Sequence, residues 1–269
     1  MKDKCCEILR KYARHEHVNI TNSGNGAIFA ALISAKKNGY SEVLVPDQGG
    51  WLTYLQYPKL LGMRTIELET DRGLMSEESV KGHKNAALLI PSFGGYIVEQ
   101  PLNEISKICK ERNILLIEDA SGSLSSETLC NGVHSDIIIA SFGEHKIVNN
   151  GHGGFISAND KKLLGHDVHS LVKPIGLDYN ALYGKLLSAP SRLKNLICRH
   201  DQVVKDLSSF EVIHRQKNGI NVAVAYRSET EKMKIIKYCE QKCIEYTYCP
   251  RYIRVLDKAV SIEIKRLRI

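Results

Sequence analysis

The stretch that decides the fold is DIIIASFGEHKIVNNGHGGF, residues 136–155. It begins with a short apolar run, residues 137–140, which is rich in β-branched side chains and predicts a buried strand. A polar loop follows, in which Gly151, Gly153 and Gly154 let the backbone turn tightly before a second expected strand, residues 155–157. Such a change at a strand end is where α/β proteins usually carry their chemistry. The loop is therefore the first place to look for a functional site.

This loop presents one hydroxyl, Ser141, and one amine, Lys146. A lysine held in this way can act as a Schiff-base nucleophile, and a nearby serine can hold an anion. The alternative is a lysine that faces solvent in a hairpin. The loop alone does not separate these two interpretations, so the rest of the chain has to decide between them.

The composition is that of an ordinary soluble globular protein. The 269 residues are enough for one large domain and a small one. No apolar run approaches the ~20 residues that a membrane-spanning helix needs. The first residues, MKDKCCE, lack the apolar core of a signal peptide. We therefore expect a cytoplasmic protein that does not bind membranes.

The eight cysteines do not form a metal-binding or disulfide pattern. None makes a Cys-x-x-Cys pair, and we expect free thiols in a reducing compartment. Cys239 and Cys243 lie four residues apart on an expected helix, a spacing that could seat a metal. Small apolar residues that face a core are the interpretation we favour, so no metal site is predicted.

Positive charge is concentrated in the C-terminal third. Residues 181–269 hold 18 Lys and Arg against 9 Asp and Glu. Such a region could meet nucleic acid, a phosphorylated substrate or an acidic partner. It lacks the interleaved aromatic residues of a nucleic-acid platform, so we do not expect nucleic-acid binding. A solvated basic face is the interpretation that we favour.

Strand and helix patterns alternate from Val18 to Phe155, which predicts an α/β fold with a mostly parallel sheet and helices on both faces. The carboxyl ends of parallel strands gather on one edge of a sheet. Five candidate site residues fall near such ends: Ser23, Trp51, Asp119, Ser141 and Lys146.

We expect two domains. Residues 1–207 form the large one and include a long connecting helix at about 180–207, in which Pro190 predicts a break or kink. Residues 208–269 form a small C-terminal α+β domain. There we expect a helix at 229–243 and strands at 219–226, near 252–255 and at 260–264.

Three features converge on the cofactor pyridoxal 5′-phosphate (PLP). This group needs a lysine for a Schiff base, an aspartate that keeps the pyridine nitrogen protonated, amides and hydroxyls for the phosphate, and an aromatic ring to stack on. The three features are Asp119 at the end of an apolar strand, Ser141 with Lys146 after a second strand, and the Ser-Gly-Asn-Gly helix start at residues 23–26. Trp51 offers the aromatic ring. Each also has a structural alternative. The helix start can be a simple cap, Asp119 a strand-end cap, Trp51 a core residue and Ser141 an ordinary loop serine.

From about Leu9 to Leu207 the sequence resembles the DegT/StrS-type sugar aminotransferases, PLP enzymes of fold type I. Four motifs carry the resemblance. The stretches at 23–27 and 43–54 are similar to the family's helix start and to its strand, proline and aromatic-headed helix. Ile-Glu-Asp-Ala stands unchanged at 117–120. Ser-Phe-x-x-x-Lys at 141–146 precedes Gly-His-Gly-Gly at 151–154, where the family has Gly-Glu-Gly-Gly.

The resemblance implies a homodimeric aminotransferase with PLP as its cofactor. Lys146 would form the Schiff base and Asp119 would pair with the pyridinium. Ser23, Gly24, Asn25 and Ser141 would bind the phosphate, and Trp51 would stack on the ring. Tyr179-Asn180 is similar to a segment that sends an asparagine to the cofactor phosphate of the other subunit, so Asn180 would take that role. The amino donor would be an amino acid such as glutamate, and the acceptor a keto sugar attached to a nucleotide diphosphate.

The chain also departs from the family pattern. Gly122 stands where the family usually has Gln or His in contact with the cofactor ring, and His152 replaces a glutamate. By comparison with the family, we also expect the N-terminal arm to be missing and the C-terminal domain to be abbreviated. Two alternatives therefore stay open: another PLP enzyme, such as a lyase or a desulfurase with Cys130 as its thiol, and a cofactor-binding or assembly protein without turnover.

Overall fold

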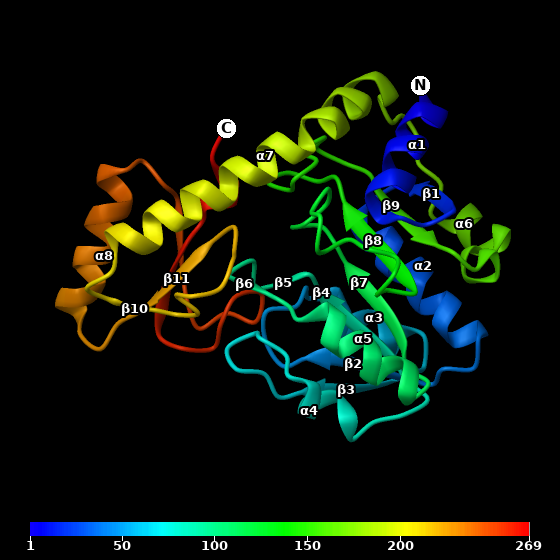
Figure 1. Cartoon of the computed structure of the whole chain (residues 1–269), viewed down its shortest axis with the longest axis horizontal. Helices are drawn as coiled ribbons and strands as arrows, with labels where there is room; N and C mark the ends of the chain where they lie inside the picture. Colours follow the sequence, from blue (N-terminus) through cyan, green and yellow to red (C-terminus); the bar gives the residue numbers. More distant parts are fainter. Residues whose placement is uncertain (269) are drawn as a thin grey trace.

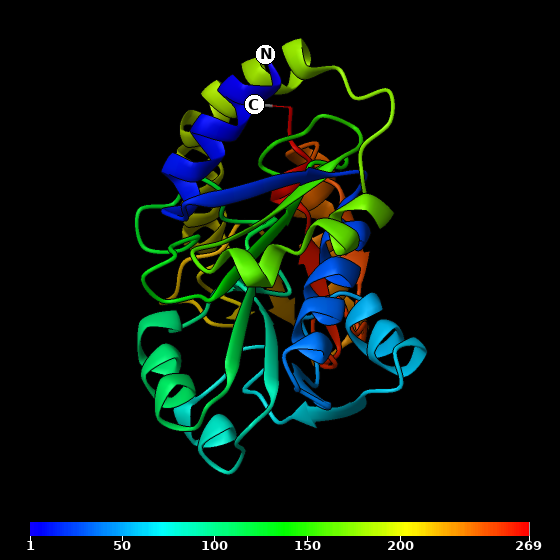
Figure 2. The ribbon, with the colours of Figure 1, turned by 90° about the vertical axis from the view of Figure 1, so that its right-hand side faces the viewer.

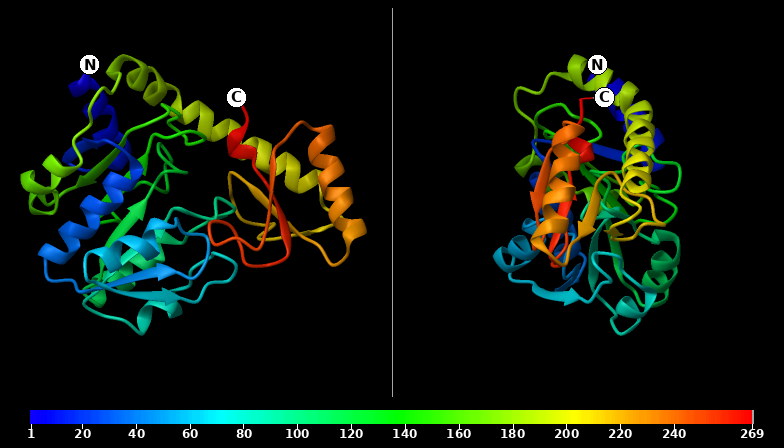
Figure 3. Two further views of the ribbon diagram at one scale, coloured as in Figure 1. Left: turned by 180° about the vertical axis from the view of Figure 1, so that it is seen from behind. Right: turned by 90° about the vertical axis from the view of Figure 1, so that its left-hand side faces the viewer.

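The computed structural model describes residues 1–268, without the side chain of His166. One long helix, α7 (Tyr179–Asp206), runs across the molecule and joins a large α/β part to a small C-terminal part (Figure 1). Seen from behind, α7 passes over both parts along one side of the molecule (Figure 3).

The large part contains a seven-stranded sheet in the order β1-β9-β8-β7-β4-β2-β3. The five strands from β8 to β3 are parallel. The strands are β1 (His17–Thr21), β2 (Glu42–Pro46), β3 (Arg64–Leu68), β4 (Ala87–Pro91), β7 (Leu115–Asp119), β8 (Ile137–Ser141) and β9 (Gly154–Ala158). The prediction of a mostly parallel α/β sheet is confirmed, and the strands predicted at residues 137–140 and 155–157 are β8 and β9.

Successive residues of the central strands point to opposite faces of the sheet. Leu88 belongs to the core that α1 (Lys2–Ala13), α5 (Leu102–Glu111) and α7 cover. Leu89 belongs to the core beneath α2 (Gly24–Lys37) and α3 (Thr53–Leu60). Figure 2 shows these helix layers on the two sides of the sheet. Because both faces are covered, the strands are apolar throughout rather than alternating.

The two strands at the β1 edge are antiparallel to their neighbours. β9 runs opposite to both β8 and β1, so β1 points in the same direction as β8. Ser23, which follows β1, therefore reaches the same edge of the sheet as Ser141, the last residue of β8. An isolated bridge between Ser23 and Gly153 joins the two loops at this edge.

The small part is a four-stranded antiparallel sheet in the order β10-β11-β13-β12, with α8 (Glu229–Gln241) packed on β13. Its strands are β10 (Glu211–Val212), β11 (Val222–Ala225), β12 (Tyr246–Tyr248) and β13 (Ala259–Ile262). The predicted strand near 252–255 is wrong. Those residues form a turn in which the Arg254 side chain points inward to Glu263, and β12 is the strand that pairs with β13 instead.

Of the break or kink predicted at Pro190, the break is wrong, since α7 is continuous through this residue. Proline lacks an N–H, so the carbonyl of Leu186, four residues earlier, loses its helical partner. The hydroxyl of Tyr12, on α1, donates to this carbonyl at 2.9 Å. A side chain of another helix thus satisfies the group that Pro190 leaves free, and α7 extends over both parts of the molecule.

Shorter elements complete the described chain: α4 (Glu77–Lys81), β5 (Phe93–Gly94), β6 (Val98–Glu99), η1 (Lys161–Leu164), α6 (His166–Leu171) and η2 (Ile264–Arg266). Within residues 1–268, no helix combines the length and apolar character that crossing a bilayer requires.

Candidate active site

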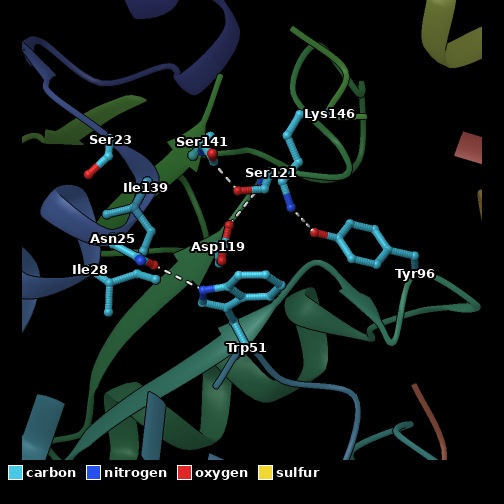
Figure 4. Close-up of a pocket in the computed structure, with 12 residues that line it drawn as sticks. Ser23, Asn25, Ile28, Trp51, Tyr96, Asp119, Ser121, Ile139, Ser141 and Lys146 are labelled. Atoms are coloured by element: carbon cyan, nitrogen blue, oxygen red, sulfur yellow. Dashed lines mark hydrogen bonds between the residues drawn. The ribbon is translucent and has the colours of Figure 1, made fainter. Parts of the chain in front are cut away.

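A pocket lies at the carboxyl edge of the large sheet (Figure 4). The structure brings seven of the predicted site residues into its wall: Ser23, Gly24, Asn25, Trp51, Asp119, Ser141 and Lys146. Asn180 is elsewhere, exposed in the first turn of α7. Ile28, Tyr96, Ser121, Ile139 and Ala140 complete the lining.

The start of α2 forms one wall of the pocket. The Ser23 hydroxyl accepts from the N–H of Gly26 at 2.9 Å, so Ser23 is the N-cap of this helix. Gly24 lies so close to β8 that a Cβ on it would come within 2.4 Å of the Cβ of Ser141. Glycine is therefore required for the helix start to approach the strand end. This approach brings the positive end of a helix beside a serine, an arrangement suited to a phosphate.

A short chain of hydrogen bonds links the ends of β7 and β8. The Ser141 N–H donates to the Ser121 hydroxyl at 2.8 Å, and the Ser121 N–H donates to Oδ1 of Asp119 at 3.0 Å (Figure 4). These bonds fix the relative positions of the carboxylate and of Ser141.

Tyr54 holds the other oxygen of the Asp119 carboxylate. This tyrosine is fully buried on α3, and its hydroxyl donates to Oδ2 at 2.8 Å. Burial first, and the Asp119 charge second, raise the pKa of Tyr54 well above its usual value, so the phenol stays protonated. Asp119 is thus a half-buried carboxylate with a fixed orientation, able to hold a proton on the ring nitrogen of a ligand in the pocket.

Trp51 precedes α3 rather than beginning it, and its indole lines the pocket. The indole N–H donates to Oδ1 of Asn25 at 2.9 Å, which ties the ring to the start of α2 (Figure 4). The Lys146 Nζ lies 5.2 Å from the centroid of the indole. The interpretation of Trp51 as a simple core residue is therefore not supported, because its ring forms a wall of the pocket.

Lys146 enters the pocket from the glycine-rich loop that follows β8. His145, just before it, has a positive φ of 60°, and a bridge between Gly143 and Gly151 closes the loop. The amine of Lys146 donates to the hydroxyl of Tyr96 on the far side of the pocket (Figure 4). The loop therefore directs this lysine inward, which rules out the solvent-facing alternative.

Sequence reasoning missed Tyr54, Tyr96 and Ser121. Ser121 follows Asp119 by two residues, and its place in the Glu-Asp-Ala-Ser run was a signal that could have been used. Tyr54 stands three residues after Trp51, in the first turn of α3, and its side chain is buried. Tyr96 follows Gly94 and Gly95 in a loop without a motif, so its position depends on tertiary packing.

The residues present fit PLP. Gly24 lies close to Ser141, so the positive end of α2 stands beside the end of β8, an arrangement that suits a phosphate. A fixed carboxylate, an indole and an amine surround the same space. A ligand with a phosphate at one end and a protonated ring nitrogen at the other matches this donor set.

Cys130 does not fit a desulfurase thiol. It is fully buried, and its N–H donates to the buried carboxylate of Glu118 at 2.7 Å. Burial, reinforced by the Glu118 charge, raises the pKa of the Cys130 thiol well above its usual value. Because the thiolate is the nucleophile, this cysteine is an inert core residue.

In sequence, the C-terminal third of the chain, residues 181–269, matches the model of the MJ1341 family C-terminal domain. The chain is also similar to two curated transaminase-type proteins. It is 30% identical over 173 residues to the UDP-4-amino-4,6-dideoxy-N-acetyl-beta-L-altrosamine transaminase of Campylobacter jejuni, covering 60% of this chain and 44% of that protein. It is 25% identical over 182 residues to the GDP-perosamine synthase of Caulobacter vibrioides, covering 64% and 47%. The matched region spans less than half the length of either relative.

Among solved structures, 3-amino-5-hydroxybenzoic acid (AHBA) synthase superimposes with a TM-score of 0.71 at 14% identity, covering 98% of this chain and 85% of that one. NtdA from Bacillus subtilis, with bound cofactor PMP, has a TM-score of 0.70 at 14% identity, covering 97% and 72%. These likenesses establish the fold. The chain thus has the architecture of the fold type I PLP enzymes and is similar in sequence to nucleotide-sugar aminotransferases.

Proposed function

We propose that this protein is a PLP-dependent aminotransferase that moves an amino group from an amino acid such as glutamate to a keto sugar carried on a nucleotide. The observation that carries the proposal is the meeting of Lys146, Asp119 and Trp51 in one pocket beside the start of α2. The names of the two curated relatives support the substrate class. The excess of Lys and Arg in residues 181–269 is compatible with an anionic substrate.

PLP, when bound, supplies an electron sink and carries the amino group between the two substrates. Lys146 would hold it through Nζ and, once released, would move a proton at the substrate carbon. Asp119, oriented by Tyr54 and Ser121, would keep the ring nitrogen protonated. Trp51 would stack on the ring, and the amides of Gly24 and Asn25, with the Ser141 hydroxyl, would hold the phosphate.

We also propose a homodimer with shared active sites. Asn180 is exposed on α7 and does not line the pocket of its own chain. Its side chain is therefore available to a second copy. Measurement of the mass in solution, with and without Asn180→Ala, tests this part of the proposal separately from the chemistry.

The test of function is a turnover assay with glutamate and nucleotide-linked keto sugars, after reconstitution with PLP. Formation of an amino sugar at the expense of glutamate supports the proposal. If the PLP-loaded protein instead removes the carboxyl group or the sulfur of the amino acid, it catalyses another PLP reaction. A protein that takes up PLP and turns over neither kind of substrate would support the binding-protein alternative.

A further inference from the structure

Two residues from outside the sheet hold Lys146. Its side chain is held by Tyr96, whose hydroxyl accepts from Nζ and whose ring centroid lies 4.9 Å from the same atom. Figure 4 shows the amine directed to this hydroxyl. Its backbone is held by Arg192 of α7, which donates to the Lys146 carbonyl at 3.3 Å. Arg192 also donates to the carbonyl of Lys265 at 3.1 Å, so the lysine loop and the C-terminal segment share one guanidinium.

Tyr96 occupies a backbone conformation that non-glycine residues rarely adopt, with φ of 68°. Its carbonyl accepts from the N–H groups of Ile220 and Asn221, each at 2.9 Å, just before β11 of the small part. Such a conformation costs free energy and persists where the surroundings enforce it. The small part of the molecule therefore fixes the residue that contacts Lys146.

The ring of Tyr96 is surrounded by positive charge. The Arg254 guanidinium carbon lies 5.3 Å from the ring centroid and the Lys265 Nζ lies 4.6 Å from it. Arg254 is neutralised by the buried carboxylate of Glu263, with N–O distances of 2.6 and 2.8 Å. Cations above an aromatic ring are attracted to its face, and together they hold the ring in one place.

Position 122 is shaped to receive this ring. A Cβ on Gly122 would come within 3.1 Å of Cδ1 and 3.2 Å of Cε1 of Tyr96. Even the smallest side chain at this position would therefore press against the tyrosine. Gly122 lies three residues after Asp119, so the Tyr96 ring takes the space beside the carboxylate that a side chain at position 122 would otherwise fill.

We propose that Tyr96 is the positioning residue of Lys146: its hydroxyl holds the lysine amine at the side of the pocket whenever that amine is free, and Arg254 and Lys265 of the small domain hold Tyr96. The catalytic role of this contact rests on the proposed function, but the hydrogen bond between Tyr96 and Lys146 does not require a cofactor. The small part of the molecule therefore has a role in the site, which it exerts through Tyr96 of the large part.

The electrostatics of Lys265 agree with this geometry. Lys265 is 6% exposed, and burial first, then the charge of Lys146, lower its pKa to about 7. Arg254 and Arg266 act in the same direction, and Glu263 opposes them. The charge of Lys146, on the other side of the Tyr96 ring, therefore opposes the protonation of Lys265.

The test measures the reactivity of Lys146 in the protein freed of PLP. Trace acetylation with acetic anhydride is followed by peptide mass spectrometry from about pH 6 to about pH 10, the range that covers ordinary amine titration. The exposed Lys194 in the same sample is the internal reference. Wild type is compared with Tyr96→Phe, which keeps the ring and removes the hydroxyl. Tyr238→Phe is the control, because it removes a hydroxyl bound to Asp206 on the far side of the small part.

We expect Lys146 to be acetylated roughly fivefold faster in Tyr96→Phe, the effect of losing about one hydrogen bond. The sign is the same for either direction of the bond. A bond donated by the ammonium stabilises the protonated, unreactive form of Lys146, and a bond donated by the phenol occupies the lone pair of the neutral amine. Tyr238→Phe should match wild type. Equal profiles in wild type and Tyr96→Phe would overturn the inference.

This outcome is separable from the proposed function. The visible absorbance of the wild-type protein after PLP addition reports the cofactor, and it does not depend on Tyr96→Phe. A wild-type protein that remains colourless contradicts the proposed function and leaves the labelling result standing. If Tyr96→Phe does not fold, Gly122→Ala, whose added methyl would lie 3.1 Å from Cδ1 of Tyr96 and press on its ring, should raise Lys146 labelling in the same direction, and an unchanged profile there overturns the inference.

Discussion

Two walls face each other across the pocket, and they are built in different ways. The sheet wall consists of Ser141, Asp119 and the start of α2, which follow strands that end at one edge. The opposite wall is Tyr96, supported by Arg254 and Lys265 from the small part. The residues of the first wall can be predicted from sequence motifs, because the carboxyl ends of parallel strands lie at one edge of the sheet. The second depends on how a distant segment packs, so it supplies the features that are particular to this chain.

The largest effect is expected on the sheet wall, from Asp119→Asn. The amide keeps the shape and loses the charge that stabilises a protonated ring nitrogen. Transamination should fall by about a hundredfold or more, a loss typical of removing an electrostatic partner of the reacting group. Tyr54→Phe, which removes the hydroxyl bonded to this carboxylate, should cost clearly less. If the two variants lose the same activity, the charge of Asp119 is not the determining feature.

A smaller effect is expected at the boundary of the two walls, from Gly122→Ala. The added methyl would lie 3.1 Å from Cδ1 of Tyr96 and should push the ring away from Lys146. Lys146 acetylation in the PLP-free protein should then rise several-fold, as in Tyr96→Phe. In the Tyr96→Phe background, Gly122→Ala should add little, because the hydrogen bond is already gone. Additive effects would show that Gly122 acts independently of Tyr96.

The opposite wall predicts a pH dependence. Lys265 has a pKa of about 7 in the folded chain, lowered by burial and by Lys146, against about 10.4 for an unfolded lysine. Between these values the unfolded state binds the proton that the folded state has lost, so the free energy of unfolding rises with pH.

Comparison with Lys265→Met isolates this contribution. Below about pH 7 both states carry the charge, and the cost of burying it is fully present in wild type. Above that pH the stability gap between variant and wild type should close, by at most about 1.4 kcal/mol per pH unit. Urea unfolding over this pH range measures it, and a gap that does not change with pH would contradict the burial of this charge.

The smallest effect concerns α7, which connects the two walls. Tyr12→Phe leaves the Leu186 carbonyl without the hydroxyl that replaces its missing helical partner. The free energy of unfolding should fall by about 1 kcal/mol. In a Pro190→Ala background, residue 190 regains an N–H that can donate to Leu186, so the same Tyr12→Phe change should then cost less. Equal costs in the two backgrounds would show that the Tyr12 bond does not compensate for Pro190.

Prediction from the sequence succeeded where a local rule decides the outcome. β8 and β9 were predicted correctly because an apolar run and a second short strand flank a polar, glycine-rich loop. Asp119 and Ser141, at strand ends, and Trp51, after a strand, were expected near one edge of the sheet, and the structure places all three in the wall of one pocket. Prediction failed where a distant group overrides the local rule. Pro190 should break a helix, but Tyr12, 174 residues before Leu186 along the chain, satisfies the carbonyl that the proline frees.

Tyr96 and Lys265 were not predicted at all, for the same reason. Nothing around Gly94-Gly95-Tyr96 indicates that its hydroxyl reaches Lys146, fifty residues later. Lys265 reads as one of many lysines in a basic segment, and its burial is visible only after β13 is packed against the large part. Residues that act through long-range packing leave no spacing signal in the chain.

The most direct test of the central claim is borohydride reduction of the protein after addition of PLP, followed by peptide mapping. The account predicts a visible absorbance band that reduction removes, with the pyridoxyl group fixed on Lys146, and no such band in Lys146→Ala. A protein that remains colourless with excess PLP, or a label fixed on another lysine while Lys146→Ala keeps the band, would contradict it.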